Sequence, residues 1–214
     1  MVGKSFQRFT GISLVAIVIG LLSSAETPAS DGPEKPTRTQ VSIKDARWYL
    51  NGRLTYPNAQ AEGLLMNVRM VNAVFEDRKR PEFDAEKNTD EFVAAIPDYA
   101  AQGVRAFTVN LQGGNPGYEG AINSAFNPDG SLRKGYLERV RRVIEACDRK
   151  GVVVILGCYY QRQDQILKDA QAVRDGVVNV VRWITESGLS NVALEIANEF
   201  NQRGYSLDSS KHKM

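Results

Sequence analysis

Amide, phenol and carboxylate side chains stand at or beside the ends of apolar segments in this sequence. Those that could contact a small ligand are Asn110, Tyr159, Tyr160, Asn198 and Glu199. Amide and carboxylate groups form hydrogen bonds with hydroxyl groups, and aromatic faces pack against the apolar faces of sugar rings. These residue types therefore predict a site for a carbohydrate.

Glu199 is the residue best placed for acid-base chemistry. In a strand, side chains alternate between two faces, so Glu195, Ala197 and Glu199 share one face while Leu194 and Ile196 lie on the other. If the apolar face packs against helices, Glu199 points toward the interior at the end of the strand. Partial burial there would raise the pKa of its carboxyl group into the range useful for a general acid.

The sequence offers little for metal or cofactor chemistry. His212 is the single histidine, which excludes a Ser-His-Asp triad and a histidine-rich zinc site. Cys147 and Cys158 are too few for a zinc ribbon, and we predict that they are buried thiols too far apart for a disulfide. The glycine-rich loop 113–117 does not lead directly into a helix, as a dinucleotide fingerprint does. We therefore predict no metal and no cofactor.

Apolar strands that alternate with amphipathic helices must position the polar groups. Because each link between predicted strands contains a helix, right-handed βαβ crossovers and a parallel sheet are expected. Two architectures fit this α/β pattern: an open doubly wound sheet, or the first half of a (β/α)8 barrel. The predicted elements are a hairpin over 41–56 that turns at Asn51-Gly52, strands over 64–75, 104–111, 152–156 and 191–197, and helices from 88 or 89 to 103, over 132–150 and over 163–187.

The segment 194–200 (LEIANEF) resembles the fourth-strand signature of the (β/α)8 glycoside hydrolases of the cellulase and mannanase families, cellulase family 5 among them. In that signature an Asn-Glu pair closes the strand. The resemblance implies that Glu199 is the general acid/base and that Asn198 contacts the sugar 2-hydroxyl group. It covers residues 41–203 and implies a partial (β/α)8 (TIM) barrel with strands one to four, their helices and a parallel sheet.

Two further positions depart from the family pattern. Arg105 resembles an arginine of the second strand in the cellulase family, but it stands at the beginning of the predicted strand, so we predict a structural ion pair. The family often has a histidine at the end of the third strand, where this chain has Tyr159 and Tyr160. We interpret these tyrosines either as a platform for a sugar ring or as ordinary packing at the rim.

The lack of an evident second catalytic carboxylate is the main departure from the family pattern. A retaining glycoside hydrolase needs a nucleophile about 5 to 5.5 Å from the acid/base, and in these families strand seven supplies it. We expect no seventh strand in the residues after Glu199, and the substitutes within the sequence are Glu76, Asp77, Glu119 and Asp164. A simpler interpretation of the Asn-Glu pair is that Asn198 caps a following helical turn.

Three functions therefore stay open at this point. The first is a glycoside hydrolase-like protein that acts on β-linked polysaccharide or oligosaccharide, with its nucleophile missing from this chain. The second is a non-catalytic carbohydrate-binding or assembly fragment. The third is a truncated gene product without function. In each case the open edge of a half barrel would favour self-association.

The ends of the chain predict its location. Residues 1–25 have the basic start, apolar stretch and small residues of a signal peptide, so we expect a secreted or periplasmic protein without stable membrane insertion. Residues 26–40 are predicted to be a disordered linker, 41–203 the half barrel and 204–214 a polar tail.

The charge balance argues against a nucleic-acid partner. Removing Lys4 and Arg8 with the signal leaves 25 basic and 25 acidic residues.

Overall fold

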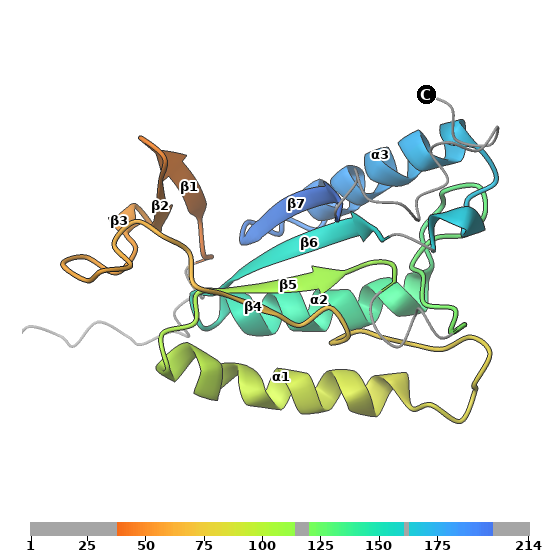
Figure 1. Ribbon diagram of the computed structural model, residues 1–214, viewed down its shortest axis with the longest axis horizontal. Helices are drawn as coiled ribbons and strands as arrows, with labels where there is room; N and C mark the ends of the chain where they lie inside the picture. The colour runs from red at the N-terminus through yellow and green to blue at the C-terminus, as the bar shows by residue number, and fades with distance from the viewer. Residues whose placement is uncertain (1–37, 114–119, 161–162, 199–214) are drawn as a thin grey trace, which may run out of the picture. The chain divides into compact units, whose positions relative to one another are not determined.

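The computed structural model describes residues 38–113, 120–160 and 163–198, which form two β-sheets and three α-helices (Figure 1). The predicted signal peptide, most of the predicted linker and the predicted tail lie outside these residues. The first sheet is antiparallel and contains β1 (Val41–Lys44), β2 (Arg47–Leu50) and β3 (Arg53–Leu54). The second is parallel and has the order β4 (Asn67–Arg69), β5 (Ala106–Asn110), β6 (Val153–Tyr159) and β7 (Val192–Ala197).

The antiparallel sheet contains two tight turns. The predicted turn at Asn51-Gly52 is confirmed: it joins β2 to β3, and both residues have positive φ angles of 50° and 73°. Such turns match the twist of the strands that they connect. A second turn, at Asp45 and Ala46 with φ angles of 50° and 58°, joins β1 to β2 and was not predicted. Alanine seldom adopts positive φ, so its presence gives no turn signal.

The first helix begins earlier than the sequence pattern indicates. Helix α1 (Ala85–Ala101) is capped by Asp84, whose side chain accepts a hydrogen bond from the Lys87 backbone N–H at 2.9 Å. The predicted N-cap at Asn88 or Thr89 is therefore wrong. The helix also continues past Pro97 and is not divided there.

The remaining elements occur where they were predicted, with different limits. Strand β4 is much shorter than the predicted strand over 64–75, because the chain turns directly after Met70. Helix α2 (Lys134–Asp148) lies within the predicted range. The predicted helix over 163–187 is a short 3-10 helix, η2 (Asp164–Ile166), followed by α3 (Ala170–Glu186).

All three helices cover the same face of the parallel sheet. One hydrophobic core contains residues from each helix and alternate residues from each strand. In a doubly wound sheet the helices would lie on both faces. Of the two predicted architectures, the arrangement is therefore that of a barrel. The residues that establish this are Ile96, Val140 and Val180 from the helices, and Val68, Phe107, Val109, Val154, Leu156 and Leu194 from the strands.

The parallel sheet curves toward its uncovered face. Side chains on a flat sheet stand nearly perpendicular to it. Arg69 of β4 nevertheless contacts Asn198, directly after β7, with 3.2 Å between Nη2 and Oδ1, although β5 and β6 lie between these outer strands. The contact therefore indicates that the sheet is curved, as a barrel wall is.

The segment before β1 is part of the packed structure. Thr39, which falls in the predicted linker, is buried, and its backbone N–H donates to the Asp148 carboxylate at 2.6 Å. Its hydroxyl donates to the Asp148 carbonyl oxygen at 3.0 Å. In the part of the chain that the structure describes, no helix is long and apolar enough to span a membrane.

Candidate functional site

The face of the parallel sheet opposite the helices carries polar side chains. They alternate along each strand with the residues of the hydrophobic core, so their side chains leave the sheet on the other side. On β4 and β5, the Asn67 side chain and the Thr108 hydroxyl form hydrogen bonds of 2.8 and 3.1 Å. The polar residues of this face are Asn67, Arg69, Thr108, Asn110 and Glu195.

Asn110, Gly157 and Glu195 stand side by side across β5, β6 and β7, and we call these three residues the amide row. Asn110 is 1% exposed, yet neither atom of its side-chain amide forms a hydrogen bond within the described residues, and Glu195 Oε2 is also buried and unpaired. A Cβ atom on Gly157 would lie 2.7 Å from Asn110 Oδ1 and 3.1 Å from Glu195 Oε2. Glycine at 157 therefore keeps open the space that the two polar groups approach.

The Glu195 carboxylate acts on the buried Cys158 thiol. Burial and, to a smaller extent, the nearby Glu195 carboxylate, which disfavours a second negative charge, together raise the pKa of the Cys158 thiol to about 12. Burial likewise raises the pKa of the Cys147 thiol to about 12. Both cysteines are buried and free, as predicted.

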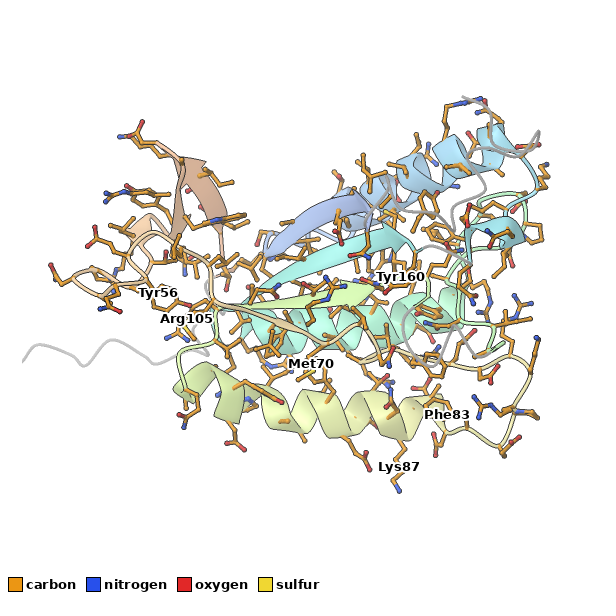
Figure 2. All side chains as sticks on the ribbon, in the orientation of Figure 1. Tyr56, Met70, Phe83, Lys87, Arg105 and Tyr160 are labelled. Atoms are coloured by element: carbon orange, nitrogen blue, oxygen red, sulfur yellow. The ribbon has the colours of Figure 1, made fainter. Side chains whose placement is uncertain are left out.

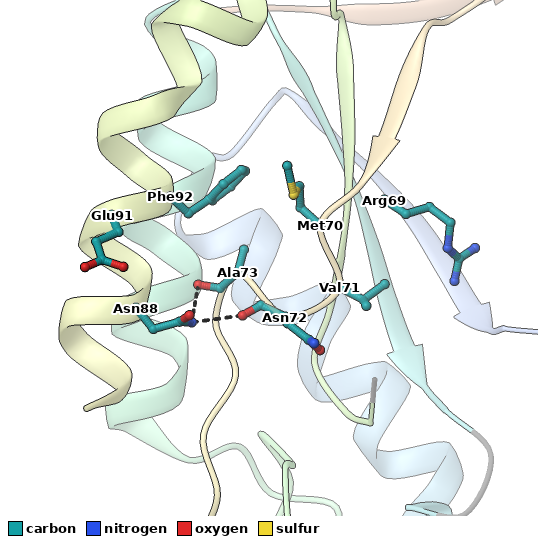
Figure 3. Close-up of a pocket in the computed structure, with 8 residues that line it drawn as sticks. All are labelled: Arg69, Met70, Val71, Asn72, Ala73, Asn88, Glu91 and Phe92. Carbon is teal, nitrogen blue, oxygen red and sulfur yellow. Dashed lines mark hydrogen bonds between the residues drawn. The ribbon is translucent and has the colours of Figure 1, made fainter. Parts of the chain in front are cut away.

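Two hydrogen bonds help to hold Asn198 at the carboxyl end of the sheet. Its backbone N–H donates to the Tyr159 carbonyl oxygen at 3.1 Å, and its Oδ1 accepts from Arg69. Only 4% of the residue is exposed. Figure 3 shows Arg69 extending to the opposite side of the β4 backbone from Met70 and Phe92, which lie toward α1. Arg69 thus connects the first strand of the parallel sheet with the residue that follows the last.

The two predicted tyrosines have different environments. Tyr159 is 4% exposed, and the centroid of its ring lies 5.1 Å from that of the Phe126 ring. Its hydroxyl donates to the Val173 carbonyl oxygen at 2.6 Å. Its ring is thus not open to a sugar in this structure, and burial raises the pKa of its hydroxyl. Tyr160 is half-buried at the carboxyl end of the strands, where its side chain leaves no room for a side chain on Gly113 (Figure 2).

Glu199 lies outside the described residues, and counting along β7 does not place it. The predicted alternation holds at Leu194 and Glu195 and then fails, because Ile196 is 58% exposed and Ala197 packs against the core. Ile196 therefore does not pack against the helices, although this was predicted for the apolar residues of this strand. β7 is an outer strand, and its end is not covered by a described helix.

The substitute carboxylates that the structure describes are engaged elsewhere. Glu76 forms ion pairs with Arg133 and with Arg139, the latter at 2.7 Å. Burial alone would raise the pKa of Asp77, but the Arg80 side chain and two backbone N–H groups outweigh it and hold that pKa below its ordinary value. Asp164 is buried, and Glu119 lies outside the described residues.

Arg105 is a structural residue, although not through an ion pair. Its Nη1 donates to the carbonyl oxygens of Ala100 and Val104 at 2.8 and 2.9 Å, which ties the end of α1 to the start of β5. Figure 2 shows Arg105 at the end of the sheet opposite to Tyr160. No group of three metal-ligating side chains occurs in residues 38–113, 120–160 and 163–198.

A cavity of about 430 Å³ opens beside β4, on the side of α1 (Figure 3). Asn88 of α1 lines the cavity, and its side-chain amide donates to the carbonyl oxygens of Asn72 and Ala73 at 2.9 and 3.4 Å. The cavity therefore lies at the junction of helix and strand, away from the amide row. Its lining residues are Arg69, Met70, Val71, Asn72, Ala73, Asn88, Glu91 and Phe92.

Comparisons with known proteins support the arrangement described above. No family model matches the chain, and a search of curated proteins finds no relative. Solved structures are similar to it. One is a Bacteroides vulgatus protein provisionally assigned as a glycoside hydrolase, at 13% identity and a TM-score of 0.51, covering 82% of this chain and 35% of that one. Another, described as a glycoside hydrolase, has 10% identity and a TM-score of 0.50, covering 77% of this chain and 34% of that one.

The chain has the fold of a partial (β/α)8 barrel. It spans about a third of the length of these two structures. A glycoside hydrolase family 5 protein of Bacteroides vulgatus is also similar, at 14% identity and a TM-score of 0.47, with coverage of 77% and 34%. The predicted fold class and the resemblance to glycoside hydrolases at the level of the fold are confirmed.

The site also contains residues that the sequence pattern did not single out. Arg69 and Thr108 were not expected to face the same side as Asn110, and Gly157 was not assigned a role. A signal existed for Thr108, since it stands two residues before Asn110 in an otherwise apolar strand. No sequence signal joins Arg69 to Asn198, because the contact depends on the curvature of the sheet.

Proposed function

We propose that this chain is a glycoside hydrolase-like protein that binds β-linked polysaccharide or oligosaccharide at the carboxyl ends of β5, β6 and β7. In barrels of this kind the functional groups gather at that end. The observation that carries the proposal is the buried Asn198, held by Arg69 at the end of β7 on a partial (β/α)8 barrel. Asn110 and Tyr160, from the neighbouring strands, complete the proposed contacts.

Glu199 is the general acid/base in this proposal. It would protonate the oxygen of the leaving sugar while Asn198 donates a hydrogen bond to the 2-hydroxyl group. These roles rest on the resemblance of the segment 194–200 to glycoside hydrolases. A second carboxylate must complete the reaction, either as the nucleophile or as the base that activates water.

We do not assign this role to Glu195, because its Oε2 is buried beside Gly157 in the amide row. Because Glu76 and Asp77 are neutralised by arginines, a second candidate function is favoured for the chain alone: binding of carbohydrate without hydrolysis.

Calorimetric titration with cellohexaose and mannohexaose, followed by an assay for reducing ends, tests the proposal. We expect binding by the unmodified chain, a loss of about tenfold in affinity in Asn198→Ala, and unchanged affinity in Glu138→Gln, an exposed carboxylate on α2. Any hydrolysis should disappear in Glu199→Gln while binding remains. Binding without hydrolysis would select the second candidate, and the absence of binding to both sugars would refute the proposal.

Two further predictions belong with this function. We propose secretion, on the basis of residues 1–25. We also propose self-association through β4 and β7, the outer strands of the parallel sheet, because the backbone groups along a sheet edge can pair with another strand. Sedimentation at micromolar concentration should detect a dimer or larger species, and a compact monomer would contradict this prediction.

A further inference from the structure

The contact between Arg69 and Asn198 fixes which way the Asn198 amide faces. A guanidinium group only donates hydrogen bonds, and a side-chain amide has one oxygen that accepts and one nitrogen that donates. The atom of Asn198 that lies 3.2 Å from Arg69 Nη2 must therefore be the oxygen. As a result, Nδ2 and its two hydrogens are directed away from Arg69.

The Arg69 guanidinium forms no ion pair with a carboxylate in the part of the chain that the structure describes, and it donates a hydrogen bond to Asn198. Hydrogen bonds from a charged donor are stronger than neutral ones. The Arg69 guanidinium is planar and presents its N–H donors in a fixed geometry.

Asn198 has little freedom to adopt the opposite orientation. The residue is 4% exposed, and its backbone is held by the hydrogen bond to Tyr159. If the amide were turned over, Nδ2 would face Arg69 and two donors would meet. Arg69 is itself exposed and could donate to water, but the buried Asn198 Oδ1 would lose its charged donor, which is unfavourable.

We propose that Arg69 is a positioning residue, which holds the Asn198 amide so that Nδ2 donates to the 2-hydroxyl group of the bound sugar and so sets the preference for sugars that carry this group. The inference rests on the proposed function, because it takes Asn198 as the contact to that hydroxyl. Arg69 itself need not touch the sugar. Its effect should therefore appear only for ligands that have the 2-hydroxyl group.

A matched set of ligands tests this role without requiring hydrolysis. Cellotetraose and four analogues, each lacking the 2-hydroxyl group on one glucose, are titrated calorimetrically into the full chain. One analogue should bind the unmodified chain about tenfold more weakly than cellotetraose, as expected for the loss of one hydrogen bond in a buried site. In Arg69→Met the affinity for cellotetraose should fall to that of this analogue, while the affinity for the analogue stays unchanged.

Three variants separate positioning from general destabilisation. Arg69→Lys, which keeps a charged donor, should retain most of the discrimination. Arg53→Met removes an exposed arginine from β3 and should leave both affinities unchanged. In the Asn198→Ala background, Arg69→Met should have no further effect on binding, because the residue through which it acts is gone.

Each outcome bears on the inference. If Arg69→Met weakens cellotetraose and the analogue equally, Arg69 is only structural and the inference is wrong, while the proposed function stands. If the unmodified chain binds all analogues equally well, the inference is also wrong. If it binds none of the sugars, the proposed function fails and the inference fails with it.

A second measurement keeps the inference falsifiable if Arg69→Met proves unstable. The side-chain amide signal of Asn198 in a proton–nitrogen NMR spectrum, identified by its loss in Asn198→Asp, reports the orientation without any ligand. In Arg69→Lys this signal should stay near its original position and should move on addition of cellotetraose. An Asn198 signal that does not respond to cellotetraose in the unmodified chain would overturn the inference.

Discussion

Two partly buried polar clusters in this protein differ in how fully their members are paired. The first, which we call the arginine cluster, joins α1, α2 and the segment after β4 through ion pairs, and it contains Glu76, Glu86, Asp90, Arg133, Arg139 and Arg142. The second is the amide row, in which neither atom of the Asn110 amide nor Glu195 Oε2 has a hydrogen-bond partner among the described residues. In the arginine cluster Nε of Arg139 and of Arg142 also lacks a hydrogen-bond partner, but both guanidinium groups form ion pairs. Buried polar groups are normally paired, so a cluster that is left unpaired points to a ligand or water rather than to stability.

The largest effect should come from breaking the arginine cluster. The Arg139 side chain is 7% exposed and pairs with Glu76. Arg139→Met leaves that carboxylate without this buried partner and should lower the free energy of unfolding by about 3–5 kcal/mol. Arg141→Met, whose side chain is 40% exposed, should change it by less than about 1 kcal/mol. Denaturant titration measures both, and equal effects would show that the cluster is not a structural unit.

A smaller loss should follow when the space over Gly157 is filled. In Gly157→Ala the new methyl group meets both polar groups of the amide row, so we expect destabilisation of about 1–3 kcal/mol and weaker sugar binding. Gly135→Ala, on α2 where nothing lies within 4 Å, should instead stabilise the protein by about 0.5 kcal/mol. A Gly157→Ala protein of normal stability and affinity would mean that the space has no role.

Two buried asparagines allow a contrast between an amide whose nitrogen is paired and one without partners: Asn191 Oδ1 has no hydrogen-bond partner among the described residues, but its Nδ2 has two. Asn191 donates to the carbonyl oxygens of Ile144 and Val152, both at 3.0 Å, so Asn191→Leu should destabilise the protein by about 1–3 kcal/mol. Asn110 has no such partners, so Asn110→Leu should stabilise it by about 1 kcal/mol and abolish sugar binding. Thermal unfolding and calorimetry test both. If Asn110→Leu instead destabilised the protein, the amide row would have a structural role like that of the arginine cluster.

The smallest effect should appear on acidification. Burial alone would raise the pKa of Glu86, but hydrogen bonds from Arg142 and Arg139 outweigh it and lower that pKa, and Asp77 is lowered in the same way by Arg80. A carboxyl group with a lowered folded-state pKa stabilises the protein above its unfolded value of about 4, and the stabilisation is lost as the pH falls through the folded value. Stability should therefore decline below about pH 4, and Glu86→Gln should make the decline shallower. An unchanged slope would contradict the assignment.

The sequence predicted the parallel βα order because apolar strands and helical stripes have clear periods, as in the unbroken apolar run 152–156. It did not predict the limits of α1, since the capping side chain of Asp84 looks like any other loop aspartate. The amide row was only partly visible. Asn110 could be placed at a strand end, whereas the importance of Gly157 and Arg69 depends on register and on curvature across strands that are distant in sequence.

The anchoring of Thr39 to Asp148 has a practical consequence for the amino-terminal boundary of the folded unit. Both hydrogen bonds to Asp148 come from one residue, and Arg38 beside it donates to the Gly188 carbonyl oxygen. A protease that cuts before Arg38 would leave these contacts in place, whereas a cut after Thr39 would remove all of them. Limited proteolysis followed by mass measurement should therefore give a resistant product that begins at or before Arg38.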